Sequence, residues 1–129
     1  MREILFRGKT ERGEWIEGFY IKDVIETYIY DKYRNTRMQS VIPETVGQYT
    51  GLTDKNGKKI FEGDIVKAQD DVFGSPFCDG IIGKIVYDEC AFFIEPKNPV
   101  DSQRLFDECA VYEVIGNIHD NPELLKGGE

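Results

Sequence analysis

Two carboxylates near the middle of the chain are the residues best placed to share a chemical site. Glu62 and Asp64 are separated by one residue, so both side chains would lie on the same face of an extended segment. A pair of this kind can bind a divalent cation or act as a general acid and base. The alternative is that Asp64 caps a turn beside Gly63, and we favour that structural role.

The single histidine, His119, is the other candidate for acid–base or metal chemistry. A zinc site needs several Cys or His ligands at local spacings, and a catalytic triad needs its histidine beside a nucleophile. His119 has neither context, and it precedes Asn121-Pro122, which signals the start of a helix. We therefore predict a surface or capping role for His119, and we expect no catalytic residue, metal site or cofactor. An enzyme would require a cleft that joins His119 to Glu62 and Asp64.

A basic and aromatic segment is the candidate for binding nucleic acid. Tyrosines that can stack on bases alternate in it with cations that can neutralise phosphates, a pattern typical of single-strand binding. The segment comprises Tyr28, Tyr30, Lys32, Tyr33, Arg34 and Arg37. A tyrosine-bearing strand followed by a solvated loop gives the same pattern. We favour that structural interpretation and keep nucleic-acid binding as an alternative function.

The charge distribution restricts this alternative to the first half of the chain. The 129 residues include 16 Lys and Arg against 24 Asp and Glu, a formal net charge of -8. Residues 1–62 carry 11 basic and 10 acidic side chains, whereas residues 63–129 carry 5 and 14. Because non-specific nucleic-acid binding depends on Lys and Arg that meet phosphates, the second half is unsuited to it. Its carboxylates suggest a further alternative, an acidic mimic of nucleic acid that binds a host protein.

The cysteine content and hydropathy favour a globular protein with reduced thiols, and one disulfide with a spare thiol is the alternative. Cys78, Cys90 and Cys109 are too few and too widely spaced to form a disulfide framework. No stretch approaches the roughly 20 apolar residues that a membrane-spanning helix requires. We expect a cytoplasmic protein that does not associate with membranes.

Branched side chains and turn signals predict a mostly β fold. Ile and Val together number 23, against 8 for Leu and Ala, and this ratio favours strands. About eight short strands are separated by turns such as Asn56-Gly57. The pattern of the second half resembles a small SH3-like barrel. We predict one domain over residues 1–129, with additional N-terminal strands in residues 1–52, a barrel-like region in residues 53–129 and a short C-terminal helix.

An early strand over residues 14–21 is unusual in carrying apolar side chains on both faces. Trp15, Glu17, Phe19 and Ile21 lie on one face, and Ile16, Gly18 and Tyr20 lie on the other. The pattern predicts a strand that is covered on both sides, either within the chain or by a second subunit.

Three segments closely resemble the YopX family of phage and prophage proteins. The central signature corresponds to residues 41–66, VIPETVGQYTGLTDKNGKKIFEGDIV. The N-terminal motif corresponds to REILFRGK with GEW, and the C-terminal motif to EVIGNIHDNPELL. The resemblance spans nearly the whole chain and implies a β-rich fold, a phage or prophage source and a bacterial host cytosol. It implies no activity and no catalytic residue, because the family has no accepted biochemical function.

Polar side chains within the central signature form the second group of candidate binding residues. They are Thr45, Gln48, Tyr49 and Thr50, and they lie among glycines. Such residues either satisfy buried backbone groups or line a small groove, and we favour the first role. For the whole chain we predict a phage- or prophage-derived interaction protein without enzymatic activity. It would act through protein–protein contacts as a homo-oligomer or with a host or phage partner.

Overall fold

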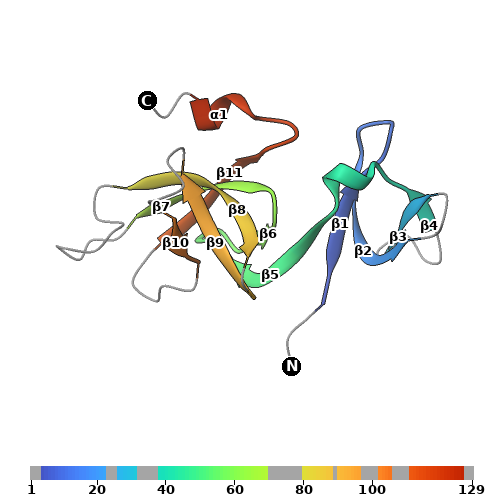
Figure 1. Ribbon diagram of the computed structural model, residues 1–129, viewed down its shortest axis with the longest axis horizontal. Coiled ribbons are helices and arrows are strands. Elements are labelled where there is room, and N and C mark those ends of the chain that lie inside the picture. The colour runs from blue at the N-terminus through green and yellow to red at the C-terminus, as the bar shows by residue number, and fades with distance from the viewer. Residues whose placement is uncertain are drawn as a thin grey trace. The chain divides into compact units, whose positions relative to one another are not determined.

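The computed structural model describes residues 4–22, 26–31, 38–69, 80–88, 90–96, 102–105 and 111–126. The chain divides into two compact units, Met1–Gly51 and Leu52–Glu129. Both are built from antiparallel strands, and the one α-helix of the described residues, α1 (Glu123–Lys126), is short and lies near the C-terminus (Figure 1). The prediction of a mostly β fold with additional N-terminal strands and a short C-terminal helix is confirmed.

The first unit is a meander of antiparallel strands followed by a single 3-10 turn. Its elements are β1 (Phe6–Lys9), β2 (Trp15–Lys22), β3 (Thr27–Asp31), β4 (Met38–Ser40), η1 (Pro43–Thr45) and β5 (Gly47–Thr53), the last of which runs on into the second unit. The hydrogen-bonding order of this sheet is β4-β3-β2-β1-β5-β6, where β6 (Lys59–Phe61) belongs to the second unit. The hairpin between β1 and β2 is closed by Thr10, whose Oγ1 accepts a hydrogen bond from the Glu14 N–H at 3.2 Å.

The core of the first unit lies on one face of its sheet. Ile16, Ile29 and Val41 are buried there, and Phe6 and Val46 pack against them. Gly8 lets the chain after β4 approach closely, because a Cβ at this position would lie 3.0 Å from the Val41 side chain.

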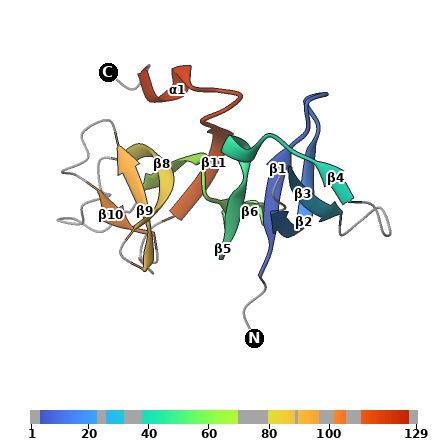
Figure 2. The ribbon, with the colours of Figure 1, turned by 45° about the vertical axis from the view of Figure 1, so that its right-hand side comes forward.

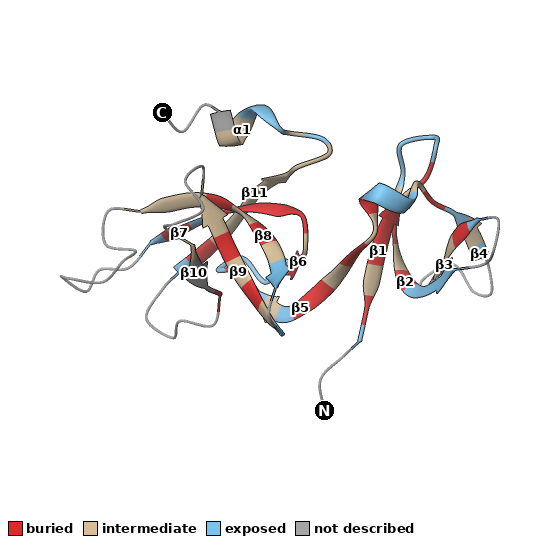
Figure 3. Cartoon of the chain, in the orientation of Figure 1, coloured by how far each residue is buried: buried red, intermediate tan, exposed pale blue. Residues whose placement is uncertain are grey.

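The outer half of β2 departs from the sequence prediction. Ile16 and Gly18 are buried, but Phe19, Tyr20, Ile21 and Lys22 are all exposed (Figure 3). Cover on both sides from within the described chain is therefore wrong for residues 19–22, whereas cover by a second subunit stays a prediction. The alternation of apolar residues predicted the strand correctly. It could not show which residues of the strand are covered by other parts of the chain.

The second unit is built around a five-stranded antiparallel sheet. Its further elements are β7 (Asp64–Gln69), β8 (Ile81–Asp88), β9 (Ala91–Pro96), β10 (Gln103–Arg104) and β11 (Val111–Asn117). The order is β10-β9-β8-β7-β11, and β8 and β9 can be followed as neighbours in two views (Figures 1 and 2). Ile60, Val66, Ile85, Phe92 and Ile94 are among the residues of its core.

Both sheets retain edge strands. In the described part of the chain these are β4 and β6 in the first sheet and β10 and β11 in the second, and no closed barrel is formed. No helix among the described residues is long and apolar enough to cross a lipid bilayer.

Candidate interaction face

Thr45 of the central signature joins the η1 turn to the end of β1. Its Oγ1 accepts a hydrogen bond from the Lys9 N–H at 2.8 Å and donates one to the Ile42 C=O at 2.6 Å. The side chain is buried. Because both polar functions of the hydroxyl are engaged with the backbone, this geometry favours the structural role of Thr45.

The other three candidates of the signature lie in β5. Thr50 is fully buried and Tyr49 nearly so, while Gln48 is half-buried opposite Phe6 of β1. The Tyr49 N–H also donates to the Leu5 C=O at 2.7 Å. These placements favour roles in strand pairing and packing over the lining of an accessible groove.

The structure brings His119 close to the turn that carries Glu62 and Asp64. The Ile118 N–H donates to the Gly63 C=O at 2.9 Å, and a Cβ on Gly63 would lie 3.8 Å from His119 Nε2. However, Asp64 is buried, and its Oδ2 accepts a hydrogen bond from the Phe61 N–H at 2.8 Å. Asp64 therefore caps the turn between β6 and β7, while Glu62 is half-buried.

A metal centre gains no support from the described residues. Among them, no three His, Cys, Asp or Glu side chains form a group that could hold an ion. Cys90 is exposed at the turn between β8 and β9, whereas Cys78 and Cys109 lie outside the described residues.

Asp54 is a structural residue whose role the sequence did not reveal. Its Oδ1 accepts hydrogen bonds from the N–H groups of Asn56 and Lys58, both at 2.9 Å, within the β5–β6 hairpin. Its Oδ2 accepts a third bond at 3.0 Å from the N–H of Val114 in β11. Burial acts to raise the pKa of this carboxyl, but the three backbone donors and the Lys58 charge together lower the pKa below its ordinary value.

The C-terminal motif likewise forms a hydrogen-bonded turn. Asn117 Oδ1 accepts from the N–H groups of His119 and Asp120, at 3.0 and 2.9 Å. Asn121 Oδ1 in turn accepts from the Asn117 N–H at 3.3 Å. The motif thus places the backbone of His119 in a hydrogen-bonded turn.

The accessible feature of the first unit is an outer aromatic face, which we define as Phe19, Ile21, Tyr28, Tyr30 and Met38. In the antiparallel register Phe19 lies opposite Tyr30, Ile21 opposite Tyr28, and Tyr30 opposite Met38. Residues directly opposite one another on antiparallel strands project to the same face of the sheet. The five side chains therefore share one face, which is opposite to the face that carries Ile16 and Ile29.

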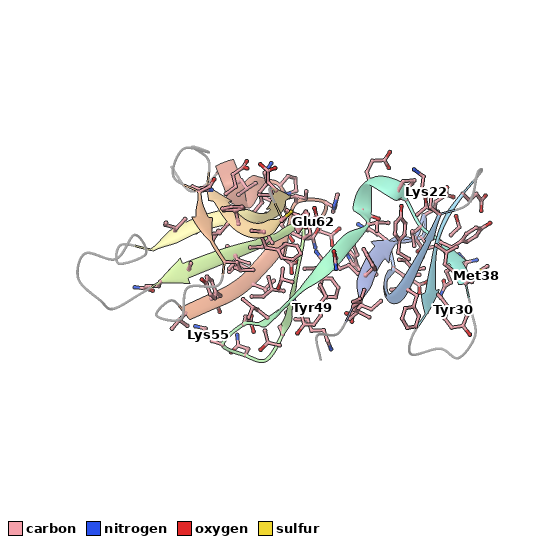
Figure 4. All side chains as sticks on the ribbon, turned by 60° about the horizontal axis from the view of Figure 1, so that its bottom comes forward. Lys22, Tyr30, Met38, Tyr49, Lys55 and Glu62 are labelled. Atoms are coloured by element: carbon pink, nitrogen blue, oxygen red, sulfur yellow. The ribbon has the colours of Figure 1, made fainter. Side chains whose placement is uncertain are left out.

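This face is exposed to an extent unusual for large apolar side chains. Phe19 is 58% exposed, Met38 52% and Ile21 39%, while Tyr28 and Tyr30 are half-buried. Figure 4 shows Tyr30 and Met38 on the neighbouring strands β3 and β4. None of the five residues is Asp, Glu, Lys, Arg or His, so the face as defined carries no formal charge.

The same side of the sheet continues along β2 to the only tryptophan of the chain. Trp15, Glu17 and Phe19 project to this face of β2, so Glu17 separates the indole from the outer aromatic face, and Trp15 lies opposite Lys9 of β1. The guanidinium carbon of Arg7 is 4.7 Å from the centroid of the Trp15 ring, and Lys9 Nζ is 5.9 Å from it. Two cations thus flank the indole at cation–π distance.

The candidate nucleic-acid segment is described only in part. Tyr28 and Tyr30 belong to the outer aromatic face, whereas Lys32, Tyr33, Arg34 and Arg37 lie outside the described residues. The structure places these two tyrosines on the same face of the sheet as Phe19, Ile21 and Met38. The sequence could not reveal that grouping, since β2, β3 and β4 are separated by unrelated connections.

The fold and the site define a small, mostly β protein with an exposed aromatic sheet face. A family model described as YopX protein matches residues 2–126, so the chain belongs to the YopX family. It is similar to the crystal structure of protein EF1440 from Enterococcus faecalis, with 28% sequence identity and a TM-score of 0.59. That similarity covers 97% of this chain and 99% of the other. No curated protein matches the sequence.

Proposed function

We propose that the protein is an interaction module without enzymatic activity and that the outer aromatic face is its contact surface. The observation that supports this is the exposure of Phe19, Ile21 and Met38 on one face of the sheet. Contiguous apolar patches on soluble proteins mark interaction sites. Aromatic residues and Met are also enriched in the cores of protein–protein interfaces, where Lys, Glu and Asp are depleted.

A second copy of the chain is the partner that fits this face. Residues 1–51 carry eight basic and eight acidic side chains, so the first unit has no formal net charge. Residues 52–129 carry eight basic and sixteen acidic side chains, and therefore the whole net charge of -8. A two-fold dimer brings one patch against the same patch of its partner, so the patch must be self-complementary. The uncharged aromatic face meets that condition, whereas an acidic surface would repel its own copy.

Static light scattering on the intact chain tests this proposal. We expect a mass of twice 14.8 kDa at micromolar concentration, with dissociation on dilution. A mass of 14.8 kDa at every concentration would rule out the second copy. Affinity purification from host cells, with and without nuclease, would then show whether a different protein or a nucleic acid occupies the face.

We also infer a phage or prophage origin and a role in the cytoplasm of the bacterial host. The chain belongs to the YopX family, and its sequence motifs resemble those of YopX proteins from phages and prophages. Both observations support this inference. The inferred phage or prophage origin would be contradicted if the gene for this protein lay in a chromosomal region without phage genes.

Single-stranded nucleic acid is the second candidate ligand of the same face. The observation that favours it is the pairing of Phe19 with Tyr30, which places two rings side by side on a sheet surface where bases can stack. If this alternative holds, a labelled single strand binds at low salt and Tyr30→Ala weakens binding at least several-fold. Arg34→Ala with Arg37→Ala should weaken it further. A wild-type protein that does not bind at low salt would exclude this function.

Four carboxylates among the described residues of the second unit weigh against the acidic-mimic alternative. Asp54 and Asp64 are buried and accept hydrogen bonds from the backbone. Glu95 and Glu113 each lie within 3.8 Å of a lysine Nζ. These four carboxylates take part in internal contacts of the unit, so they do not form a row available to a basic partner.

A further inference from the structure

A hollow of about 770 Å³ lies in the first unit beside the edge strand β4. Three separate segments line it: the β1–β2 turn through Thr10–Arg12, the residue Glu26 at the start of β3, and the strand Met38–Ser40. This volume is in the range of pockets that bind ligands. Among the described lining residues Met38 belongs to the outer aromatic face and Ser40, opposite Tyr28, lies on the same side of the sheet, whereas Glu11 and Glu26 are not part of that face.

Backbone hydrogen bonds hold the three segments around the hollow. Beyond β4, the Val41 N–H donates to the Thr27 C=O at 2.9 Å, and the next N–H, of Ile42, donates to the Lys9 C=O at 2.8 Å. The chain after β4 therefore connects the start of β3 to the end of β1. The turn itself is fixed by Thr10, which is buried and bonded to Glu14 through both its N–H and its Oγ1. Glu11 and Arg12 consequently project from an ordered turn, which limits the entropy lost when a ligand binds.

The charged groups of the hollow are available to a ligand. Glu11, Arg12 and Glu26 are all exposed. Within the described part of the chain, none of these three side chains takes part in an ion pair, whether with one another or with a neighbour. The described lining therefore offers two carboxylates, one guanidinium and the Ser40 hydroxyl, and its formal net charge is -1.

The edge strand indicates the shape of the ligand. β4 is the last strand in the order of its sheet and pairs with β3 on one side. The other side of an edge strand presents backbone N–H and C=O groups that can pair with an added strand. Peptides bind in this way by strand addition, with side-chain pockets that supply specificity.

We propose that the hollow binds an extended segment of a partner protein, which lies along β4 and presents a Lys or Arg side chain to Glu11 and Glu26. The backbone of the segment supplies the pairing with β4, and its cation is attracted by the two carboxylates. Arg12 disfavours a second basic residue next to the first, because like charges at close range repel each other. Neither Glu11 nor Glu26 is part of the outer aromatic face, so this site does not depend on self-association.

Titration with synthetic peptides tests the site directly. The probe is an acetylated, amidated Thr-Val-Thr-Lys-Thr-Val-Thr, and its matched control carries Glu in place of Lys. Binding is followed by NMR through the backbone amides of Met38–Ser40. We expect the Lys peptide to shift these amides and to bind roughly threefold to tenfold more tightly than the Glu peptide, as two exposed charge pairs allow. Equal affinities, or unshifted β4 amides with both peptides, would overturn the proposal.

Variants assign the charge preference to particular side chains. Glu11→Gln combined with Glu26→Gln should remove the preference for Lys, whereas Glu44→Gln should retain it. Glu44 is an exposed carboxylate of the same unit that does not line the hollow. Arg12→Gln should tighten binding of the Lys peptide, and a loss of affinity in that variant would contradict a basic ligand. Phe19→Lys should leave peptide binding unchanged, which separates a failure of this site from a failure of the aromatic face.

Discussion

Tyr30 lies directly opposite Phe19 in the register of β2 and β3, so the two rings occupy one face of the sheet. The β4 residue opposite Tyr30 is Met38, which extends the same face by one strand. On the other face, by contrast, Ile29 and Ile16 are buried. The first unit therefore packs one side of its sheet and leaves apolar side chains of the other side in contact with solvent.

Replacing Thr45 tests whether the central signature is structural. Thr45→Val removes the acceptor of the Lys9 N–H and the donor to the Ile42 C=O, and it should lower the free energy of unfolding by about 1–2 kcal/mol. Thr45→Ser keeps the hydroxyl and should recover most of that loss. Urea unfolding followed by circular dichroism measures both. An unchanged unfolding midpoint in Thr45→Val would show that the hydroxyl does not stabilise the fold.

Removal of the Asp54 carboxylate should loosen the link between the β5–β6 hairpin and β11. Asp54→Ala leaves three backbone N–H groups without their acceptor, and we expect a loss of about 2 kcal/mol. Hydrogen exchange at the Val114 amide should accelerate at the same time. Asp88→Ala is the matched control, because Asp88 is an exposed carboxylate of β8 and its removal changes the charge equally. Equal effects of the two variants would contradict the specific role of Asp54.

The lowered pKa of Asp54 predicts a stability that depends on pH. Because the folded pKa lies below the unfolded value, the charged carboxylate stabilises the fold above the unfolded pKa, near 3.9. This contribution disappears as the pH falls through the folded pKa. Between about pH 5 and about pH 3 the wild type should therefore lose more free energy of unfolding than Asp54→Asn. Parallel curves for the two proteins would show that Asp54 is not responsible.

Gly83 should be intolerant of any side chain. A Cβ at this position in β8 would lie 2.6 Å from the Glu95 C=O oxygen and 2.9 Å from the Pro96 nitrogen, and both are backbone atoms of β9. Gly83→Ala should therefore cost about 2 kcal/mol, because the two strands must separate. Lys84→Ala, one residue along, loses only a partly exposed ion pair with Glu95 and should cost less than about 1 kcal/mol. Similar unfolding midpoints for the two variants would contradict this packing.

Local signals in the sequence were sufficient to predict the turns and the class of the fold. Asn56-Gly57 forms the predicted tight turn. Gly57 adopts a φ of 80°, a backbone conformation that residues with a Cβ atom rarely adopt. The C-terminal helix follows Asn121 and Pro122 as predicted. These features depend on neighbouring residues alone, so they can be read without knowledge of the tertiary structure.

Contacts between distant residues could not be predicted in the same way. Asp54 accepts a hydrogen bond from an N–H sixty positions along the chain, and no local pattern encodes that partner. Alternation on β2 showed that Trp15, Phe19 and Ile21 share one face, but periodicity does not reveal whether that face is covered. The neighbours of Phe19 in space depend on the register of three strands. Only the structure could therefore identify the outer aromatic face.

Self-association through this face is tested most directly by light scattering on two lysine variants. Phe19→Lys places a charge on the outer aromatic face, while Val111→Lys introduces the same charge at a comparably exposed apolar residue of β11. Circular dichroism should confirm that both variants fold. We expect the wild type and Val111→Lys to show twice the mass of 14.8 kDa and Phe19→Lys to show a single copy. A wild type that is monomeric at every concentration, or a Phe19→Lys variant that still forms the dimer, would contradict an interface at this face.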